Sequence, residues 1–394
     1  MYKIKDIFVD IACSQECHFG EVICGDTFLS QITKSGDESI AVLADGLGHG
    51  VKANVLSTLT ASMAINNEYG FSDIKSLAYN IVNTLPVCSK RKVSYSTFSI
   101  VKINHKTKKA LIIEYDNPRA LIYREDKIIE VSSYLCEVER ENYRPQKIYK
   151  SEFDIQTGDR IVLMSDGVTH SGINVEKYKF GWGRDNVSNF VSDKILKDKN
   201  ISSKSLSNAI LIQAVNNEKS VTFDDISCAV ITIRKPKKAI IVSSLPQNND
   251  KNSFLSNRIT SFEGKKMIWG YHTASIISNV SGNSIKKDFL SDDIDIPPMW
   301  HIKGIDVVSE CMKTINKVYN VLNHSDSFYK QKGGAFNIVK TLLESDSIHF
   351  VIGKNNKEQN DSQVQDFILE KNMMKNIYNL LENQYQKAVT IEYV

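Results

Sequence analysis

The stretch Leu43-Ala44-Asp45-Gly46-Leu47-Gly48-His49-Gly50 places an aspartate in a turn rich in glycine. Just before it, Ser39–Leu43 has the apolar, β-branched character of a buried strand, and apolar residues after the turn recur at helical spacing. Asp45 is therefore expected where a strand ends, with its carboxylate pointing into a cleft. The neighbouring glycines let the backbone approach an ion closely or take positive φ angles. The stretch indicates a metal-binding turn.

A second apolar strand, Arg160–Met164, ends in the same way, with Ser165 followed by Asp166 and Gly167. Further acidic positions flank strand-like segments at Asp26 and at Asp224-Asp225. Buried carboxylates are costly unless cations neutralise them, and oxygen-only ligands favour Mg²⁺ or Mn²⁺ over zinc. The alternative is ordinary turn chemistry, because Asp-Gly is a common turn pair.

In their order and spacing, these motifs resemble those of metal-dependent phosphatases of the protein phosphatase 2C superfamily. The matching segments are Gly25-Asp26, Ala44–Gly50, Ser165-Asp166-Gly167 and Asp224-Asp225-Ile226-Ser227. The most similar branch is the bacterial one typified by the stage II sporulation protein E phosphatase. The resemblance covers roughly residues 1–235. It implies a protein serine/threonine phosphatase with two Mn²⁺ or Mg²⁺ ions per active site, built as an α-β-β-α sandwich.

The same resemblance implies roles for individual residues. Asp45 would bridge both metals and Gly46 would offer its carbonyl, while Asp45 and Asp166 form the catalytic centre. The expected metal ligands are Asp26, Asp45, Gly46, Asp166, and Asp224 or Asp225. Asp224 aligns better with the last ligand of the family, but both aspartates stay candidates. A hydroxide bridging two metals can attack phosphorus in line, so no protein nucleophile is required.

The residues agree with a mechanism that needs no protein nucleophile, since no Gly-x-Ser-x-Gly elbow and no cysteine in an arginine loop is present. The arginine that grips phosphate in the broader superfamily has no clear counterpart before Asp26. Substrate binding is therefore expected to depend more on the metals. His49 and His170 are candidate general acids, and the alternative for both is a histidine that hydrogen-bonds its loop.

Composition limits the class of partner. The chain has 394 residues, of which 42% are hydrophobic, enough for two domains. Its 49 basic and 46 acidic residues give a net charge of only +3, which argues against nucleic acid or an anionic membrane as the partner. No apolar run approaches the length of a membrane span or the core of a signal peptide, so a cytoplasmic location is expected. By resemblance, the substrate is a phosphorylated bacterial regulatory protein such as an anti-sigma factor antagonist.

The seven cysteines form an odd number and contain no Cys-x-x-Cys pair. This pattern argues against a disulfide framework and predicts reduced thiols. Cys13, Cys17 and His18 lie close enough in sequence to suggest, as an alternative, a soft-metal or redox site.

Helices are predicted at 51–67 and 74–85, an antiparallel meander of strands at 96–103, 110–115, 120–124 and 128–132, and helices at 185–197 and 203–216. In the branch that the chain resembles, the helix pair after the glycine turn is where regulation acts, by moving the turn and its metal ligand. Residues 51–85 match that position.

A charged, proline-containing connector, Arg234–Lys238, separates the phosphatase domain 1–235 from a smaller α/β accessory domain, 236–394. Strands are expected at 239–243, 266–269, 348–352 and 388–393, alternating with helices near 272–280, 304–323, 335–345 and 364–384, and 354–363 as a loop. Gly270–Thr273 opens a helix after a strand, which suits an anion but is also an ordinary connection. Met299-Trp300 offers exposed apolar anchors. Ligand sensing, recruitment of the phosphoprotein and formation of a homodimer remain open roles for this domain.

Two other functions are compatible with the motifs. One is a catalytically silent or partner-activated binding protein that keeps the phosphatase fold, although such a protein should lose metal ligands and none is lost here. The other is a hydrolase of small phosphoesters, because a metal site alone does not distinguish phosphoserine from a metabolite.

Overall fold

The computed structural model describes residues 7–33, 35–66, 74–84, 96–140, 143–173, 178–219, 221–243, 249–287, 299–309, 312–323, 334–353 and 361–394. The chain divides into two compact units, Ile7–Lys235 and Pro236–Val394, and each is considered by itself. Among the described residues, no helix has both the length and the apolar character needed to span a membrane.

The first unit contains two antiparallel sheets, one six-stranded and one five-stranded. The six-stranded sheet has the order β2 (Thr27–Ile32), β3 (Glu38–Gly46), β4 (Ser96–Asn104), β5 (Lys109–Tyr115), β9 (Tyr143–Asp154) and β8 (Ser133–Arg140). The five-stranded sheet has the order β1 (Phe8–Glu16), β11 (Ile226–Arg234), β10 (Arg160–Met164), β6 (Leu121–Arg124) and β7 (Lys127–Ile128).

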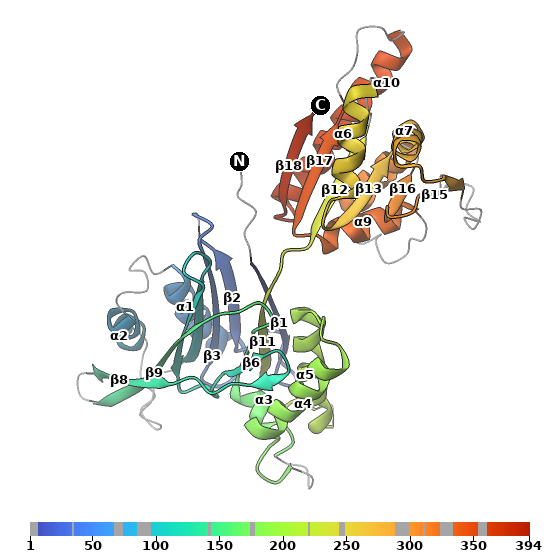
Figure 1. The fold of residues 1–394 in the computed structure, drawn as a ribbon. Helices are drawn as coiled ribbons and strands as arrows, with labels where there is room; N and C mark the ends of the chain where they lie inside the picture. Colours follow the sequence, from blue (N-terminus) through green and yellow to red (C-terminus); the bar gives the residue numbers. More distant parts are fainter. Residues whose placement is uncertain are drawn as a thin grey trace. The chain divides into compact units, whose positions relative to one another are not determined.

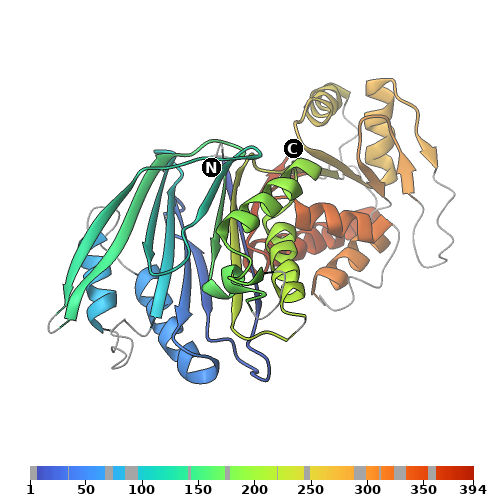
Figure 2. The same ribbon diagram turned by 90° about the horizontal axis from the view of Figure 1, so that it is seen from below.

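Helices cover the outer faces of both sheets, so the layers run helix, sheet, sheet, helix (Figure 1). The six-stranded sheet carries α1 (Gly50–Ile65) and α2 (Ile74–Thr84), and the five-stranded sheet carries α3 (Asp166–His170), α4 (Arg184–Lys197) and α5 (Ser203–Asn217). Figure 2 shows the blue helices and the green helices from a second direction. The predicted α-β-β-α sandwich is confirmed.

The period of two along a strand sorts side chains between these layers. On β3, Val42 and Ala44 face α1 and α2, whereas Ala41 and Leu43 lie in the apolar layer between the sheets. Asp45 follows Ala41 and Leu43 at the same spacing of two residues, so it lies on the same side of β3. The sequence alternation therefore directs this carboxylate to the end of the layer between the two sheets.

Small residues form the buried side of α1. Ala53, Ser57 and Ala61 are fully buried, so the helix backbone approaches β3 closely. The larger apolar residues of the predicted helical stripe point outward instead, with Val51 61% and Val55 60% exposed. Bulk is excluded from the inner face because it would hold the helix away from the glycine turn.

The predicted meander is wrong in two respects. Its strands belong to different sheets, and of the strand predicted at 128–132 only Ile128 lies in a strand, β7. β4 and β5 pair with each other, but the chain then crosses at Asn117-Pro118, and β6 pairs with β10 in the five-stranded sheet. β5 pairs with β9 instead. The sequence does not predict β8 and β9, because charged residues recur along both strands. The hairpin that they form is only partly buried, so it lacks a continuous apolar pattern.

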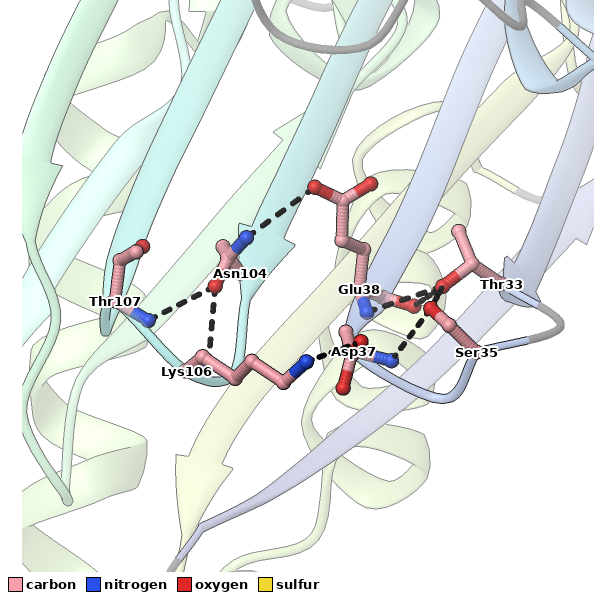
Figure 3. A network of polar contacts seen from close by, with 7 residues as sticks. All are labelled: Thr33, Ser35, Asp37, Glu38, Asn104, Lys106 and Thr107. Atoms are coloured by element: carbon pink, nitrogen blue, oxygen red, sulfur yellow. Dashed lines mark hydrogen bonds and ion pairs between the residues drawn. The ribbon is translucent and has the colours of Figure 1, made fainter.

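A polar network ties together the hairpin turns at the end of β3 that lies opposite Asp45 (Figure 3). Lys106 Nζ donates to Asp37 at 2.7 Å, and the Asn104 amide donates to Glu38 at 3.3 Å. Asp45 lies seven positions after Glu38 along β3, a distance of roughly 23 Å at the usual rise of a strand. Lys106 is therefore a useful control position for substitutions near Asp45.

The second unit contains a seven-stranded sheet. Its order is β14 (Lys286–Lys287), β15 (Met299–His301), β16 (Val307–Ser309), β13 (Lys265–Trp269), β12 (Lys238–Ser243), β17 (Ser347–Ile352) and β18 (Ala388–Tyr393). The strands from β16 to β18 are parallel. Numbered by their order in the chain, these five strands lie across the sheet in the order 3-2-1-4-5, which is a doubly wound arrangement. One face carries α6 (Asn249–Thr260) and α7 (Tyr271–Ser281), and the other carries α8 (Met312–Asn323), α9 (Gly334–Glu344) and α10 (Asp361–Asn383). The predicted α/β class is confirmed.

Three predictions in this unit need adjustment. The helix expected from residue 304 begins at Met312, because Val307–Ser309, which opens with two β-branched valines, pairs with β13 as β16. Met299 and Trp300 are half-buried rather than exposed, and the ring of Trp300 lies 4.5 Å from that of Tyr271. Of the predicted loop 354–363, residues 354–360 lie outside the described residues, and 361–363 already belong to α10.

Candidate metal centre

Four aspartates from separate parts of the sequence gather at the end of the layer between the two sheets. Asp45 interacts electrostatically with Asp26, Asp166 and Asp224. Asp45 ends β3, Asp166 opens α3 directly after β10, and Asp224 precedes β11. The sequence motifs that suggested a shared site are therefore brought together.

Burial and mutual repulsion raise the pKa values of Asp45, Asp26 and Asp224 and so favour their neutral forms. Burial, and then the neighbouring carboxylates, raise the pKa of Asp45 well above its usual range. The pKa of Asp26 is raised to about 8, chiefly by burial, although hydroxyls of Ser227 and Ser165 favour its charged form. Burial followed by Asp166 raises the pKa of Asp224 to about 6. Asp26 Oδ2 is buried and has no hydrogen-bond partner among the described residues.

An anionic donor set made only of oxygen fits a hard divalent cation such as Mg²⁺ or Mn²⁺. Within the described residues, the one group of acidic, histidine or cysteine ligand atoms that all lie within 4.8 Å of one another is Cys17, Cys24 and Asp225. The four aspartates are spread more widely than this.

The geometry separates Asp224 from Asp225. Both carboxylate oxygens of Asp225 accept backbone N–H bonds, from His18 at 3.0 Å and from Gly25 at 2.9 Å. Asp224 accepts one such bond, from the N–H of Asp225 at 2.9 Å, and faces Asp166. Asp225 therefore organises the surrounding loop, which leaves Asp224 as the better candidate ligand.

Two glycines allow the segments of the site to pack this closely. A Cβ atom at Gly46 would lie 2.1 Å from the carbonyl oxygen of Ala53 in α1, and one at Gly167 would lie 2.2 Å from that of Asp225. Neither contact is tolerated without moving backbone. The requirement at Gly46 is for close approach, in addition to the carbonyl role expected from the resemblance.

The two histidines occupy different surroundings. His49 Nδ1 lies 2.7 Å from Glu21 Oε1, and the ring stacks on that of His18 with centroids 4.2 Å apart. His170 Nδ1 lies 3.5 Å from Asp166 Oδ2. His49 thus anchors the loop between β1 and β2, and His170 flanks a candidate ligand. A general-acid role for either residue stays a prediction.

The expectation of reduced thiols is wrong for two cysteines, because Cys17 and Cys24 form a disulfide within the loop between β1 and β2. The odd count concealed the pair, since Cys13, Cys136 and Cys228 are free and Cys88 and Cys311 lie outside the described residues.

A cleft of about 860 Å³ opens beside Asp166. Its lining includes the basic side chains of Arg119, Lys147 and Arg184. Arg119 pairs with Glu114 at 2.9 Å, and Arg184 donates to the carbonyl oxygens of Arg119 and Ala120 at 3.2 Å each. Lys147 is exposed and has no ion pair with another described residue. The cleft thus presents a free cation close to the acidic centre.

Sequence reasoning missed several residues around the centre. Ser165 and Ser227 lie at the spacing of two residues that points side chains of β10 and β11 into the layer between the sheets. This alternation in the sequence would have predicted that both serines face the centre. Asp116 also lines the cleft, with a left-handed φ of 55°, and Asp166 helps to raise its pKa after burial. Nothing local in the sequence distinguished Asp116 from an ordinary turn residue.

Comparison with known proteins gives one family match. Residues 35–234 match the family model described as Stage II sporulation protein E (SpoIIE). A search of curated proteins finds no match.

Three solved structures with a similar fold are distant in sequence. The SpoIIE phosphatase domain from Bacillus subtilis is 16% identical, with a TM-score of 0.44 over 59% of this chain and 94% of that one. RsbX in complex with magnesium is 20% identical, with a TM-score of 0.40 over 57% and 95%. The RsbU and RsbW domains of a Mycobacterium tuberculosis protein are 16% identical, with a TM-score of 0.44 over 59% and 63%.

The family model spans about half of the chain and includes the glycine turn, the second Asp-Gly motif and Asp224. On that match, the chain belongs to the Stage II sporulation protein E (SpoIIE) family.

Proposed function

We propose that this chain is an Mn²⁺- or Mg²⁺-dependent protein serine/threonine phosphatase that acts on a phosphorylated bacterial regulatory protein, such as an anti-sigma factor antagonist. The observation that carries the proposal is the convergence of four aspartates whose mutual repulsion calls for cations, in a chain of this family. Two ions per site are expected because the carboxylates spread beyond one coordination shell.

In this proposal Asp26, Asp45, Asp166 and Asp224, with the carbonyl of Gly46, would hold the two cations. When bound, the cations would activate the attacking water and neutralise the phosphoryl oxygens. His170 would orient Asp166 through their 3.5 Å contact. Asp225 would hold the loop that carries Asp26, through the bond that it accepts from Gly25.

The cleft beside Asp166 supports a protein substrate over a small phosphoester. Its volume of about 860 Å³ exceeds the needs of one phosphoserine, and lies near the upper end of the range for ligand pockets. Lys147 and Arg119 would bind residues that flank the phosphoserine, and the ring of Tyr149, over which Arg119 lies at 4.4 Å, would form the floor.

The test is release of phosphate by the full chain from a phosphoserine peptide and from p-nitrophenyl phosphate, with Mn²⁺, with Mg²⁺ and with a chelator. Metal-dependent turnover with a preference for the peptide supports the proposal. Preference for sugar or nucleotide phosphates would indicate a small-molecule hydrolase, and a folded but inactive protein would indicate a silent binding protein or a missing activator.

Reversing the charge at Lys147 tests the role of the cleft. Lys147→Glu should raise KM for a phosphopeptide with acidic flanking residues about tenfold, because one cation is replaced by an anion at the rim. Kinetics with p-nitrophenyl phosphate, which has no flanking residues, should stay within about twofold of wild type. Lys106→Glu on the β4–β5 turn is the matched control. Equal effects of the Lys147 variant on both substrates would contradict the assignment.

Metal should stabilise the protein more as the pH rises. The raised pKa values of Asp26 and Asp224 mean that the unfolded chain loses these protons near pH 4, before the folded chain does. The metal-free protein therefore loses stability between about pH 4 and pH 8. We expect the Mn²⁺-induced rise in Tm to be larger at pH 8 than at pH 5.5, by differential scanning fluorimetry. An equal rise at both pH values would contradict cation binding by these carboxylates.

For Pro236–Val394 we propose an accessory, regulatory or sensing role. In doubly wound sheets, ligands bind at the carboxyl ends of the strands where the strand order reverses, here between β12 and β17. Activity of the full chain that responds to a ligand of this unit would support the role.

A further inference from the structure

We propose that Cys17 and Cys24 form a reversible redox site that sets the geometry of the acidic centre, so that the disulfide form binds metal tightly and the dithiol form binds it weakly. This inference rests on the proposed function for its effect on catalysis, but its structural part can be measured without turnover. The loop that the disulfide closes, Cys17–Cys24, joins β1 to Asp26 and β2.

One side of the loop holds the segment that carries Asp224. The N–H groups of His18 and Gly25, each next to a bridged cysteine, donate to the two oxygens of Asp225 at 3.0 and 2.9 Å. Thr222 Oγ1 donates to the carbonyl oxygen of Cys17 at 2.7 Å. The disulfide fixes the spacing of the two N–H donors, and with it the position of the Asp224-Asp225 peptide.

The other side of the loop holds the start of α1, just after the glycine turn. Glu21 pairs with His49 at 2.7 Å, and the His18 ring stacks on His49 at 4.2 Å. Asn54 Nδ2 in α1 donates to the carbonyl oxygen of Cys24 at 2.8 Å. The short bridged loop therefore contacts three segments that carry candidate ligands: the glycine turn, Asp26 and Asp224.

Reduction breaks the covalent link between Cys17 and Cys24 but removes none of the candidate metal ligands. Opening the disulfide leaves Asp26 and Asp224 in place but lets residues 17–24 move independently, so the donors of Asp225 lose their fixed spacing. Groups that orient ligands from outside the coordination shell change metal affinity about 10- to 100-fold when lost. The expected consequence is weaker metal binding with an intact fold.

The redox step is thiol–disulfide exchange with a dithiol, either a redox protein or a small molecule. The dithiol supplies two electrons and two protons, the Cys17–Cys24 bond breaks to give two thiols, and the reductant becomes a disulfide. Both bridged cysteines are only half-buried, so an attacking thiolate can reach the bond between them.

The experiment compares the oxidised full chain with the chain reduced by dithiothreitol. Alkylation followed by mass spectrometry reports the state of each cysteine, electron paramagnetic resonance of free Mn²⁺ reports binding, and hydrogen exchange reports the His18 and Gly25 amides. We expect Cys17 and Cys24 to be protected from alkylation before reduction. Reduction should weaken Mn²⁺ binding about tenfold and accelerate exchange of both amides.

A Cys17→Ser/Cys24→Ser variant should behave like the reduced protein in either condition, and Cys136→Ser, which removes a half-buried free thiol on β8, should keep the full response. Free alkylation of both cysteines in the oxidised protein, or unchanged exchange and Mn²⁺ binding after reduction, would overturn the proposal. Redox-dependent binding without phosphatase activity would leave this inference standing and refute the proposed function. Phosphatase activity with no redox effect would overturn this inference and leave the proposed function standing.

Discussion

Asp45→Asn is expected to reduce kcat/KM for phosphopeptide by roughly 1,000-fold, the scale seen when a group that stabilises transition-state charge is removed from an active site. The carboxylate of Asp45 interacts with all three other aspartates of the centre. An amide of nearly the same shape keeps the packing but removes the negative charge that would hold the cations. Steady-state kinetics at saturating Mn²⁺ measures the loss.

The same substitution should stabilise the metal-free protein, because a buried asparagine needs no proton to stay neutral, whereas burial makes the Asp45 carboxyl keep a proton that the unfolded chain loses. We therefore expect a higher Tm than wild type in chelator, together with a smaller rise on adding Mn²⁺. Asp193→Asn, on an exposed position of α4, is the control and should change neither quantity. A destabilised apo variant, or activity within tenfold of wild type, would count against the role of Asp45.

Gly46→Ala should have the second largest effect, with a loss of about 3 kcal/mol in stability and about 100-fold in activity. The new Cβ would lie 2.1 Å from the carbonyl oxygen of Ala53, so the backbone of α1 or β3 must move. Because Asp45 is the preceding residue, this movement shifts its carboxylate relative to Asp166. Chemical denaturation and phosphopeptide kinetics measure the two losses.

Gly48→Ala is the matched control within the same turn. A Cβ atom at Gly48 would meet no described atom within 4 Å. The only loss of stability expected for this variant comes from placing alanine at the φ of 98°, and it should be about 1–2 kcal/mol. Steric contact with α1 therefore predicts a clearly larger effect at Gly46. Equal effects at the two glycines would show that general flexibility of the turn, and not close approach of α1, is what matters.

The parts of this fold that the sequence predicts are those with strong local patterns. The apolar runs before Asp45 and Asp166 are strands, and the amphipathic segments became α2, α4 and α5 with ends within a few residues of those expected. The acidic motifs could be grouped because each follows or precedes such a strand. Their gathering at one end of the inter-sheet layer follows from the period of two.

Features that depend on distant pairing were not predictable. The crossing from β5 to β6 is decided by which partner each strand finds, and β6 pairs with β10 more than thirty residues later. The outward-facing Val51 and Val55 contradict simple amphipathicity, because close packing selects small residues under α1. The odd number of cysteines in the whole chain concealed the Cys17–Cys24 pair. The basic side chains of the cleft come from separate segments of the sequence, so no local motif predicts that they gather.

The pairing of β1 with β11 has a consequence for biosynthesis. Phe8 is opposite Arg234 in this register, so the first described strand of this unit pairs with its last described strand. At a synthesis rate of about 5–20 residues per second, β1 waits roughly 10 to 45 seconds for its partner. During that interval its backbone donors and acceptors on that side are open to other strands. Nascent chains that stall before residue 226 should therefore depend on chaperones more than the finished protein does.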